Sequence, residues 1–328
     1  MKLAGRWSSI RGVKFLTLRT SSLAASLALG SLSLVGCSDS EWETAYRLER
    51  AAALAAVSPE TTFLDFGTDE ARVRLIDGWS FNETNDAGLS FVWSHGPTSS
   101  FGFYAFPPAG DAAPATLRFR ALPLEAPDAP EQRIDLEING RELGELVLPE
   151  GIAESEFSIP VDALIAGWNV LDVRYSWIRS DLASQQDRRW RRIDRDLAVA
   201  WIEARLEHPA IRSEPSSTQS PGIDLRGEVL EIPAHQLLEF EFELSEGHRL
   251  VVEQGSCDAC GTGWQIEVYL GRLEEAGLRL AGTLNPTTPA VDLGTDRLDT
   301  YRLLLRNRSE QVVALQHPRI ERPSAAQR

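Results

Sequence analysis

The stretch IDLEING, residues 134–140, decides the fold of the region around it. Its isoleucines and its leucine alternate with Asp135 and Glu137, which is the period of two expected for a strand with one buried face. Asn139 and Gly140 follow directly, and asparagine before glycine favours the backbone of a tight β-hairpin turn. The stretch therefore predicts an antiparallel sheet with a buried face and an exposed face.

The same alternation recurs along most of the chain. It is seen at residues 117–121, 134–138, 171–175, 238–244, 266–270 and 301–305. No sustained period of 3.6 residues interrupts it, so we expect an all-β fold of two antiparallel jelly-roll β-sandwiches, over residues 61–208 and 223–322. Residues 209–222 are rich in serine, proline, threonine and glycine and predict a linker, and residues 323–328 are a tail.

The N-terminus resembles a bacterial lipoprotein signal. Residues 1–20 are basic, residues 21–36 are small and apolar, and Cys37 follows. The apolar run is shorter than the ~20 residues that a membrane span needs. The resemblance to a lipobox implies cleavage after residue 36, lipidation of Cys37 and anchoring in the outer membrane, with the body in the periplasm or at the cell surface. An ordinary secretory signal with an incidental cysteine is the alternative.

Residues 37–60 are expected to separate the lipid from the first sandwich. Ser40 and Glu43 have the spacing of a capping box, and the alanine-rich run 51–56 has high helix propensity. We therefore expect a short helical spacer over Ser40–Val57.

The mature chain is strongly acidic. The five basic residues of the first 36, including both lysines, leave with the signal, so residues 37–328 keep 28 arginines against 48 acids. The resulting formal net charge of −20 opposes nucleic-acid binding through a global field. The absence of lysine excludes a P-loop lysine, a Schiff base and a Ser–Lys dyad.

The order of elements in the first region resembles a known class of domain. An extended strand is followed by the Asn139–Gly140 hairpin, a proline-ended strand at 146–149, a G-x-N-x-L strand from Gly167 and D-L-A-V at 196–199. This order resembles galactose-binding-like jelly rolls, in particular the non-catalytic N-terminal regions of bacterial lipoprotein sulfatases. The resemblance covers most of residues 61–208 and, more weakly, 223–322. The sequence ends at Arg328, where the catalytic domain of such a sulfatase would begin.

Sequence patterns of catalysis are scarce. A sulfatase needs a C/S-x-P-x-R motif, and the nearest match at residues 213–217 lacks the arginine. Neither H-E-x-x-H nor G-x-S-x-G occurs, and the five histidines lack metal-ligand spacing. We therefore expect a non-enzymatic protein without a cofactor. Asp65, Asp69 and Glu70 could hold a structural calcium ion, or they could form an ordinary solvated turn.

Cys257 and Cys260 form a C-x-x-C pair. Thiol redox chemistry favours a first cysteine at a helix N-terminus, whereas a glycine-rich run and then a strand follow this pair. In an oxidising periplasm we expect a disulfide that staples a loop.

A basic loop between Ser176 and Arg195 is the candidate ligand site. Guanidinium groups match sulfate, carboxylate and phosphate groups, and indole rings stack on sugars. The candidate residues are Trp177, Arg179, Arg188, Arg189, Trp190, Arg191 and Arg192. The ligand would be an anionic or sulfated glycan or a lipid head group. Ion pairs with the aspartates of the same loop are the structural alternative.

Three functions remain open from the sequence. The first is a membrane-anchored, non-enzymatic carbohydrate-binding lipoprotein. The second is the accessory half of a split sulfatase whose catalytic domain is encoded separately. The third is an envelope scaffold that binds other proteins.

Overall fold

The structure is a computed structural model in which strands predominate. It describes residues 42–107, 113–125, 129–180, 196–209, 211, 225–226, 228–258, 260, 263–275 and 277–324. The expected signal peptide, Cys37 and most of the expected linker and tail lie outside these residues. Within them, no helix is long and apolar enough to cross a membrane. The prediction of an all-β fold of antiparallel sheets is confirmed.

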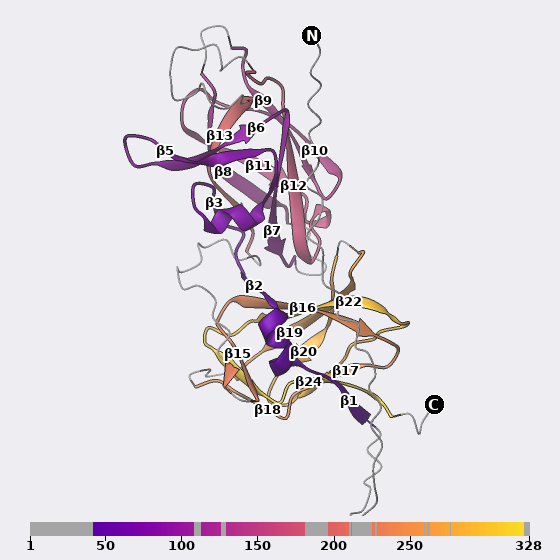
Figure 1. Ribbon diagram of the computed structural model, residues 1–328. Coiled ribbons are helices and arrows are strands. Elements are labelled where there is room, and N and C mark those ends of the chain that lie inside the picture. Colours follow the sequence, from indigo (N-terminus) through magenta and orange to yellow (C-terminus); the bar gives the residue numbers. More distant parts are fainter. Residues whose placement is uncertain are drawn as a thin grey trace, which may run out of the picture. The chain divides into compact units, whose positions relative to one another are not determined.

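Two antiparallel sheets form the first sandwich (Figure 1). One has strand order β10-β9-β12-β7-β4, and the other has order β11-β8-β13-β6-β5, with β3 paired to β13. Its elements are β3 (Leu64–Asp65), η2 (Glu70–Arg74), β4 (Leu75–Asp77), β5 (Trp79–Thr84), β6 (Ser90–His95), β7 (Thr98–Ala105), β8 (Ala115–Pro123), β9 (Arg133–Ile138), β10 (Arg141–Val147), β11 (Ala153–Ile159), η3 (Val161–Ala163), β12 (Gly167–Tyr175) and β13 (Leu197–Glu207). Apart from the β9–β10 hairpin, successive strands from β7 to β13 alternate between the sheets, which is a jelly-roll arrangement.

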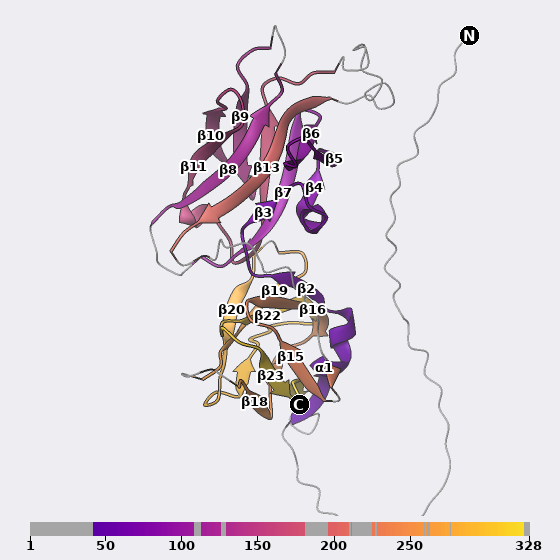
Figure 2. The ribbon, with the colours of Figure 1, turned by 90° about the vertical axis from the view of Figure 1, so that its left-hand side faces the viewer.

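The alternating sequence determines which face of each strand is buried. Every second side chain of β8, β9 and β12 enters the core between the sheets, as the pattern predicted. Figure 2 shows β8 and β13 side by side in one of the two layers. The core includes fully buried Trp201, whose indole N–H donates a hydrogen bond to the Tyr175 hydroxyl (3.0 Å). The polar atom of this large side chain is therefore satisfied inside the core.

The predicted hairpin joins β9 and β10. Asn139 and Gly140 have φ angles of 52° and 79°, the left-handed conformation that a tight hairpin turn requires. Asn139 is also held by its side-chain amide, which donates to the Ala163 carbonyl (3.0 Å) and to Asn169 Oδ1 (2.9 Å). The turn that the sequence predicted therefore fixes the start of β10 against the rest of the sheet.

The second sandwich takes strands from both ends of the described chain. A sheet of order β2-β16-β22-β19-β20 and two smaller sheets, β1-β24-β17-β21 and β14-β15-β23-β18, enclose one core. Its elements are β1 (Trp42–Arg47), α1 (Leu48–Ala51), η1 (Ala52–Leu54), β2 (Ala56–Pro59), β14 (Leu225–Arg226), β15 (Val229–Ile232), β16 (Gln236–Leu244), β17 (Arg249–Val251), β18 (Gln254–Ser256), β19 (Ile266–Arg272), β20 (Arg279–Leu284), β21 (Ala290–Asp292), β22 (Asp299–Asn307), β23 (Val313–Gln316) and β24 (Arg319–Pro323). The alternating runs in β16, β19 and β22 supply buried side chains to this core, as predicted.

The expected helical spacer over Ser40–Val57 is wrong. The described part of this segment is strand β1, the two short helical elements α1 and η1, and strand β2. β1 pairs with β24 and β2 pairs with β16, and Leu48 between them is fully buried in the second core. Pairing and burial outweigh the helix propensity of the alanines, because an isolated helix of this length is marginal in water. The second sandwich therefore includes residues that precede the first sandwich in the chain.

A buried ion pair follows β2 directly. Arg306 of β22 pairs with Glu60 and also with Glu267 of β19 (2.8 Å), and the Arg306 side chain is only 4% exposed. Burial alone would lower the pKa of the Arg306 guanidinium, but the hydrogen bond that Arg306 donates to Glu60 and the charges of Glu60 and Glu267 outweigh burial and raise this pKa. Since breaking a buried pair leaves an uncompensated charge, Glu60 ties the end of β2 to the centre of its sheet.

Candidate binding cleft on the first sandwich

The structure describes only part of the predicted arginine loop. Trp177 and Arg179 are both partly exposed just after β12, and the Arg179 backbone makes a β-bridge to Leu197. Arg188, Arg189, Trp190, Arg191 and Arg192 lie outside the described residues. The anionic-ligand site at this loop therefore stays a prediction.

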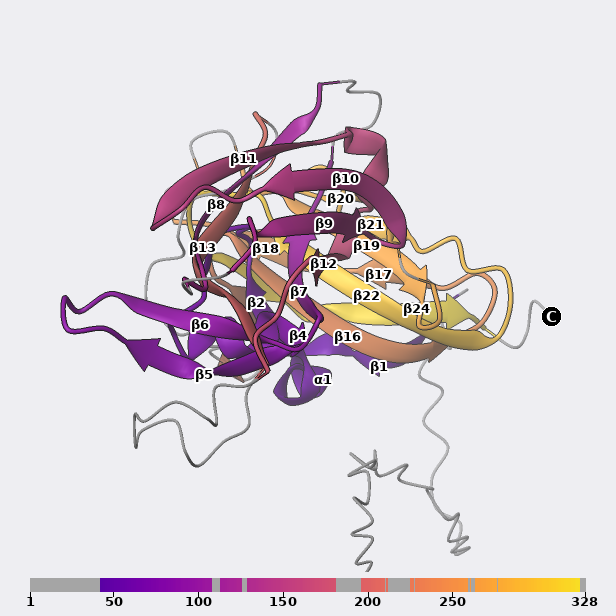
Figure 3. The ribbon, with the colours of Figure 1, turned by 90° about the horizontal axis from the view of Figure 1, so that it is seen from above.

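A cleft of about 440 Å³ lies elsewhere on the first sandwich. It lies on the outer face of the sheet that contains β10, β9, β12 and β7, strands that Figure 3 shows in sequence across the layer. The side chains that enter the core from these strands leave the alternate positions to face outward. Because the outward positions belong to paired strands, the register of the sheet sets how the cleft residues are spaced.

One cross-strand row of the cleft carries three carboxylates. Glu142 of β10 lies opposite Glu137 of β9, and Glu137 lies opposite Asp172 of β12. The row ends at Ser100 of β7, whose hydroxyl donates a hydrogen bond to Asp172 Oδ1. Directly opposite side chains have Cβ atoms about 4.5–5.5 Å apart, and like charges in such positions are destabilising. Folding alone therefore gives no reason for this row.

A second row lies two residues further along the strands. Asp135 lies between Glu145 of β10 and Arg174 of β12, and Arg174 lies opposite Thr98 of β7. Glu145 accepts a hydrogen bond from Arg133 (2.7 Å), which raises the pKa of the Arg133 guanidinium. Within the described part of the chain, Asp135 and the three carboxylates of the first row take part in no ion pair.

An indole ring lies on the same outward face, four residues before Asp172. Trp168 of β12 lies opposite Tyr104 of β7, with ring centroids 5.0 Å apart in an edge-to-face arrangement. The indole also covers Gly102, where a Cβ atom would come within 2.0 Å of the ring. Only glycine lets the indole lie this close to β7, and Gly102 separates Tyr104 from Ser100. The partly exposed Trp168 side chain therefore reaches along the sheet towards the cleft.

Two of the three acids considered for calcium accept local hydrogen bonds. Asp65 Oδ1 accepts from the Gly67 N–H (3.3 Å), and Asp69 Oδ1 accepts from the Asn82 amide (3.2 Å). Burial raises the pKa of the Asp65 carboxyl, although the Gly67 hydrogen bond opposes the rise. Among the residues that the structure describes, no group of three acid, histidine or cysteine side chains could hold a metal ion. Calcium stays unassigned.

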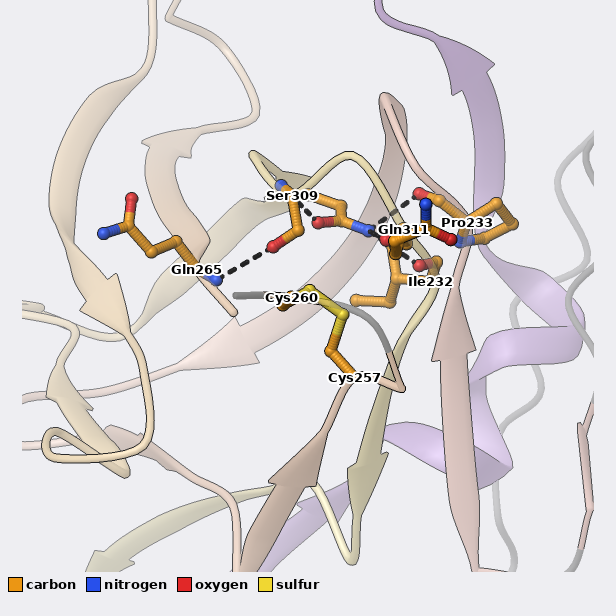
Figure 4. Close-up of a disulfide and its surroundings, with 8 residues drawn as sticks. Ile232, Pro233, Cys257, Cys260, Gln265, Ser309 and Gln311 are labelled. Carbon is orange, nitrogen blue, oxygen red and sulfur yellow. Dashed lines mark hydrogen bonds between the residues drawn. A yellow bond between two sulfur atoms is a disulfide. The ribbon is translucent and has the colours of Figure 1, made fainter. Parts of the chain in front are cut away.

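The predicted disulfide between Cys257 and Cys260 is confirmed (Figure 4). Both cysteines pack against the core of the second sandwich. The strand and loop beside them are fixed by other bonds, since the Gln265 N–H donates to Ser309 Oγ (3.0 Å) and the buried Asn307 amide donates to the Ile232 carbonyl (2.9 Å). The pair is therefore a staple in the loop that joins β18 to β19.

Sequence reasoning missed the cleft. In the sequence, Asp135, Glu137 and Asp172 were interpreted only as the polar residues of alternating strands. The alternation predicted which residues of three strands face outward. It did not predict the register of the strands, which decides which of these residues lie opposite one another. Trp168 precedes Asn169 of the G-x-N-x-L run, and the local sequence does not predict that its ring packs on a glycine of another strand.

The comparisons with known proteins show likeness only at the level of structure. No family model matches the chain, and no curated protein matches it. The C-terminal CBM6 of a marine laminarinase from Zobellia galactanivorans has a TM-score of 0.29 and 12% identity, over 47% of this chain and 100% of that one. A CBM36 domain of a xylanase from the hindgut metagenome of Trinervitermes trinervoides has a TM-score of 0.28 and 10% identity, over 48% and 100%. A CBM22 tandem from Paenibacillus barcinonensis Xyn10C has a TM-score of 0.26 and 10% identity, over 75% and 92%. At these TM-scores the likenesses carry no argument about function.

Proposed function

We propose that the first sandwich binds a polysaccharide in the cleft on the β10-β9-β12-β7 face, without catalysing a reaction. The observation that carries the proposal is the combination, on one rigid sheet, of the Trp168 ring with two rows of polar side chains. Sugar rings offer an apolar C–H face that an indole can cover, and hydroxyl groups that need hydrogen-bond partners. The cleft and the Trp168 ring beside it together provide both kinds of contact.

The side chains of the cleft suit hydroxyl groups. Carboxylates accept hydrogen bonds, so Glu137 and Asp172 can each bind a sugar hydroxyl, while the Arg174 guanidinium can only donate. Because these side chains project from paired strands, binding would require little ordering of the backbone. An extended site on a rigid sheet fits a polymer better than it fits a single small molecule.

The charge of the cleft argues against an anionic glycan at this place. Such a ligand would meet the carboxylates of both rows and a single lining arginine. A sulfated or anionic glycan is therefore proposed only for the predicted arginine loop, which has the opposite charge. Within the described residues, no contact favours the split-sulfatase hypothesis or the scaffold hypothesis over this proposal.

The proposed place of action comes from the sequence. Lipidation of Cys37 in the lipobox-like run would hold the protein at the outer membrane, since each buried CH₂ of an acyl chain contributes ~0.8 kcal/mol. A cleft on an anchored protein would keep a polysaccharide at the cell envelope. Replacing Cys37 with alanine should release the protein from the membrane fraction, and a variant that is still processed and membrane-bound would contradict the anchor.

The test of binding is affinity electrophoresis of residues 37–328 carrying Cys37→Ser, against neutral, cationic and anionic polysaccharides. We expect at least one of them to retard the protein. Trp168→Ala should weaken that binding by about tenfold or more, because buried tryptophans dominate binding energies. Trp177→Ala is the matched control, since Trp177 is also partly exposed but lies after the end of β12, in the predicted arginine loop.

Each outcome separates the two candidate sites. Loss of binding in Trp168→Ala, at an unchanged melting temperature, supports the cleft. Loss of binding only in Trp177→Ala would move the site to the arginine loop. If no polysaccharide retards the parent protein, the carbohydrate-binding proposal is wrong.

A further inference from the structure

We propose that the glycan bound in the cleft carries protonated amines, so that its substrate class is an amino-sugar polymer with free amino groups. This inference rests on the proposed function. The cleft, the Trp168 ring beside it and the strand register carry it together. Five acidic side chains and one arginine line the cleft, and only one of the five acids, Glu145, is paired with an arginine. The electrostatic potential in the cleft is therefore negative, which favours the binding of cations.

Repulsion between the carboxylates of the first row is the energetic reason to expect a cationic ligand. Glu142, Glu137 and Asp172 lie opposite one another on consecutive strands. The Ser100 hydroxyl donates one hydrogen bond to Asp172 but brings no positive charge. A ligand that places ammonium groups along the row would relieve the repulsion and satisfy carboxylate oxygens at the same time. A neutral sugar would satisfy the oxygens and leave the repulsion in place.

The spacing of the acids favours a chain of cations over a single metal ion. Each strand contributes one carboxylate to the row, at the separation of paired strands, and no described group of three acids is close enough to hold a metal. Carboxylates distributed in this way meet successive points of a ligand that crosses the strands. Successive residues of an amino-sugar polymer present their amines in the same distributed manner.

The indole of Trp168 distinguishes an amino-sugar polymer from other polycations. Trp168 lies on the same outward face as Asp172, and it is seated over Gly102 towards the acidic row. A ring stacked on the indole would bring its substituents towards Asp172 and Glu137. A basic peptide could pair with the carboxylates but has no saturated ring to place on the indole, so its binding would not depend on Trp168.

The experiment compares two oligosaccharides of equal length with residues 37–328 carrying Cys37→Ser. One is a glucosamine oligomer with free amines, and the other is its fully N-acetylated form, which is neutral. Calorimetry at low ionic strength should give at least tenfold tighter binding of the free-amine form. The advantage should shrink in 1 M salt, where the Debye length falls to about 3 Å.

Charge-removing variants locate the effect. Glu137→Gln with Asp172→Asn keeps the shape of the row and leaves one accepting oxygen on each side chain while removing two charges. It should weaken binding of the free-amine form about tenfold, or roughly threefold for each exposed charge pair lost, and leave the acetylated form unchanged. Glu241→Gln is the control, because Glu241 is an exposed acid on β16 of the second sandwich.

The outcomes separate this inference from the proposed function. Equal affinity for the two oligosaccharides, with both sensitive to Trp168→Ala, would overturn the amine inference and keep the sugar site. Binding of neither form, together with the absence of binding to any other polysaccharide, would overturn both. Polylysine binding that matches the free-amine oligomer and ignores Trp168→Ala would show that the cleft selects a basic peptide, which also overturns the inference.

Discussion

The two sandwiches share an all-β architecture but use their acidic residues differently. In the second sandwich, Glu321 accepts hydrogen bonds from Arg249 and Arg319, and Asp296 accepts two from Arg272. In the cleft of the first sandwich, four of the five acids have no such partner among the described residues. The difference indicates that acids of the second sandwich stabilise its fold, while acids of the cleft remain free to meet a ligand. The two sandwiches also differ in their continuity along the chain, because only the second sandwich is built from strands near both ends of the described chain.

The largest predicted effect comes from deleting residues 42–59. The second sandwich should then fail to fold, because β24 and β16 lose their partners and Leu48 leaves the core. The first sandwich should remain folded, since no strand of its two sheets is removed. Hydrogen exchange followed by mass spectrometry should show lost protection in β16, β19 and β22 and unchanged protection in β8, β9 and β12.

A permuted chain provides the control for this deletion. Trp42 at the start of β1 lies opposite Pro323 at the end of β24, so a short turn can join residue 324 to residue 42. Residues 225–324 followed by such a turn and residues 42–59 should fold alone and give dispersed amide signals in NMR spectra. Residues 223–322 without this addition should not. A folded 223–322 fragment would contradict the role of β1 and β2.

An intermediate effect is expected from the disulfide, which only the second sandwich has among the described residues. Replacing Cys257 and Cys260 with serine should lower the free energy of unfolding of the second sandwich by about 2 kcal/mol, the chain-entropy value for so small a ring. The first sandwich should be unchanged. Urea unfolding followed by ¹⁹F NMR of fluorotryptophan can separate them, because Trp264 lies in the second core and Trp201 in the first. Ser256→Ala is the neighbouring control.

The smallest predicted effect is an opposite response of the sandwiches to acid. Hydrogen bonds from Arg272 lower the pKa of Asp296 in the second sandwich. Burial raises the pKa of Glu321, but Arg249 and Arg319 outweigh it, so this pKa is lowered too. Both acids add stability above their unfolded pKa of about 4, and this stability is lost as the pH falls through the folded values.

The contribution of Asp65 to the stability of the first sandwich has the opposite dependence on pH. Burial raises the pKa of its carboxyl, so its contribution is largest at acid pH and is lost as the pH rises through the folded value. Urea midpoints at pH 7 and pH 3, followed at Trp264 and Trp201, should therefore fall more for the second sandwich. Glu321→Gln should reduce that fall. An equal loss in both sandwiches would show that general charge repulsion dominates.

The sequence predicted strands best where one face is deeply buried. Alternation is unbroken in β9, and it holds in β16 from Leu238 to Leu244, because each inward side chain enters a core. Strand β1 was missed because it has no such alternation and its partner, β24, lies at the other end of the chain. Local propensity then favoured a helix, which tertiary pairing overrode.

The candidate cleft was less accessible to sequence reasoning than the fold. Outward positions follow from alternation, but cross-strand rows depend on register, and a bulge between Glu142 and Gly144 shifts β10 against β9. The basic loop drew attention because its composition contrasts with the rest of the chain. The cleft has the acidic composition of the whole protein and differs from it only in geometry.

The pairing of β1 with β24 also sets the order in which the protein can be completed. β1 and β2 are synthesised before the other described strands, yet β1 has no partner until almost the whole described chain has been made. Contacts so distant in sequence form slowly, and unpaired edges expose the growing chain to aggregation and proteolysis. A chain truncated before Arg319 would leave β1 unpaired and the second core open. We therefore expect cellular proteases to remove incomplete copies, while complete copies close their own edge and persist.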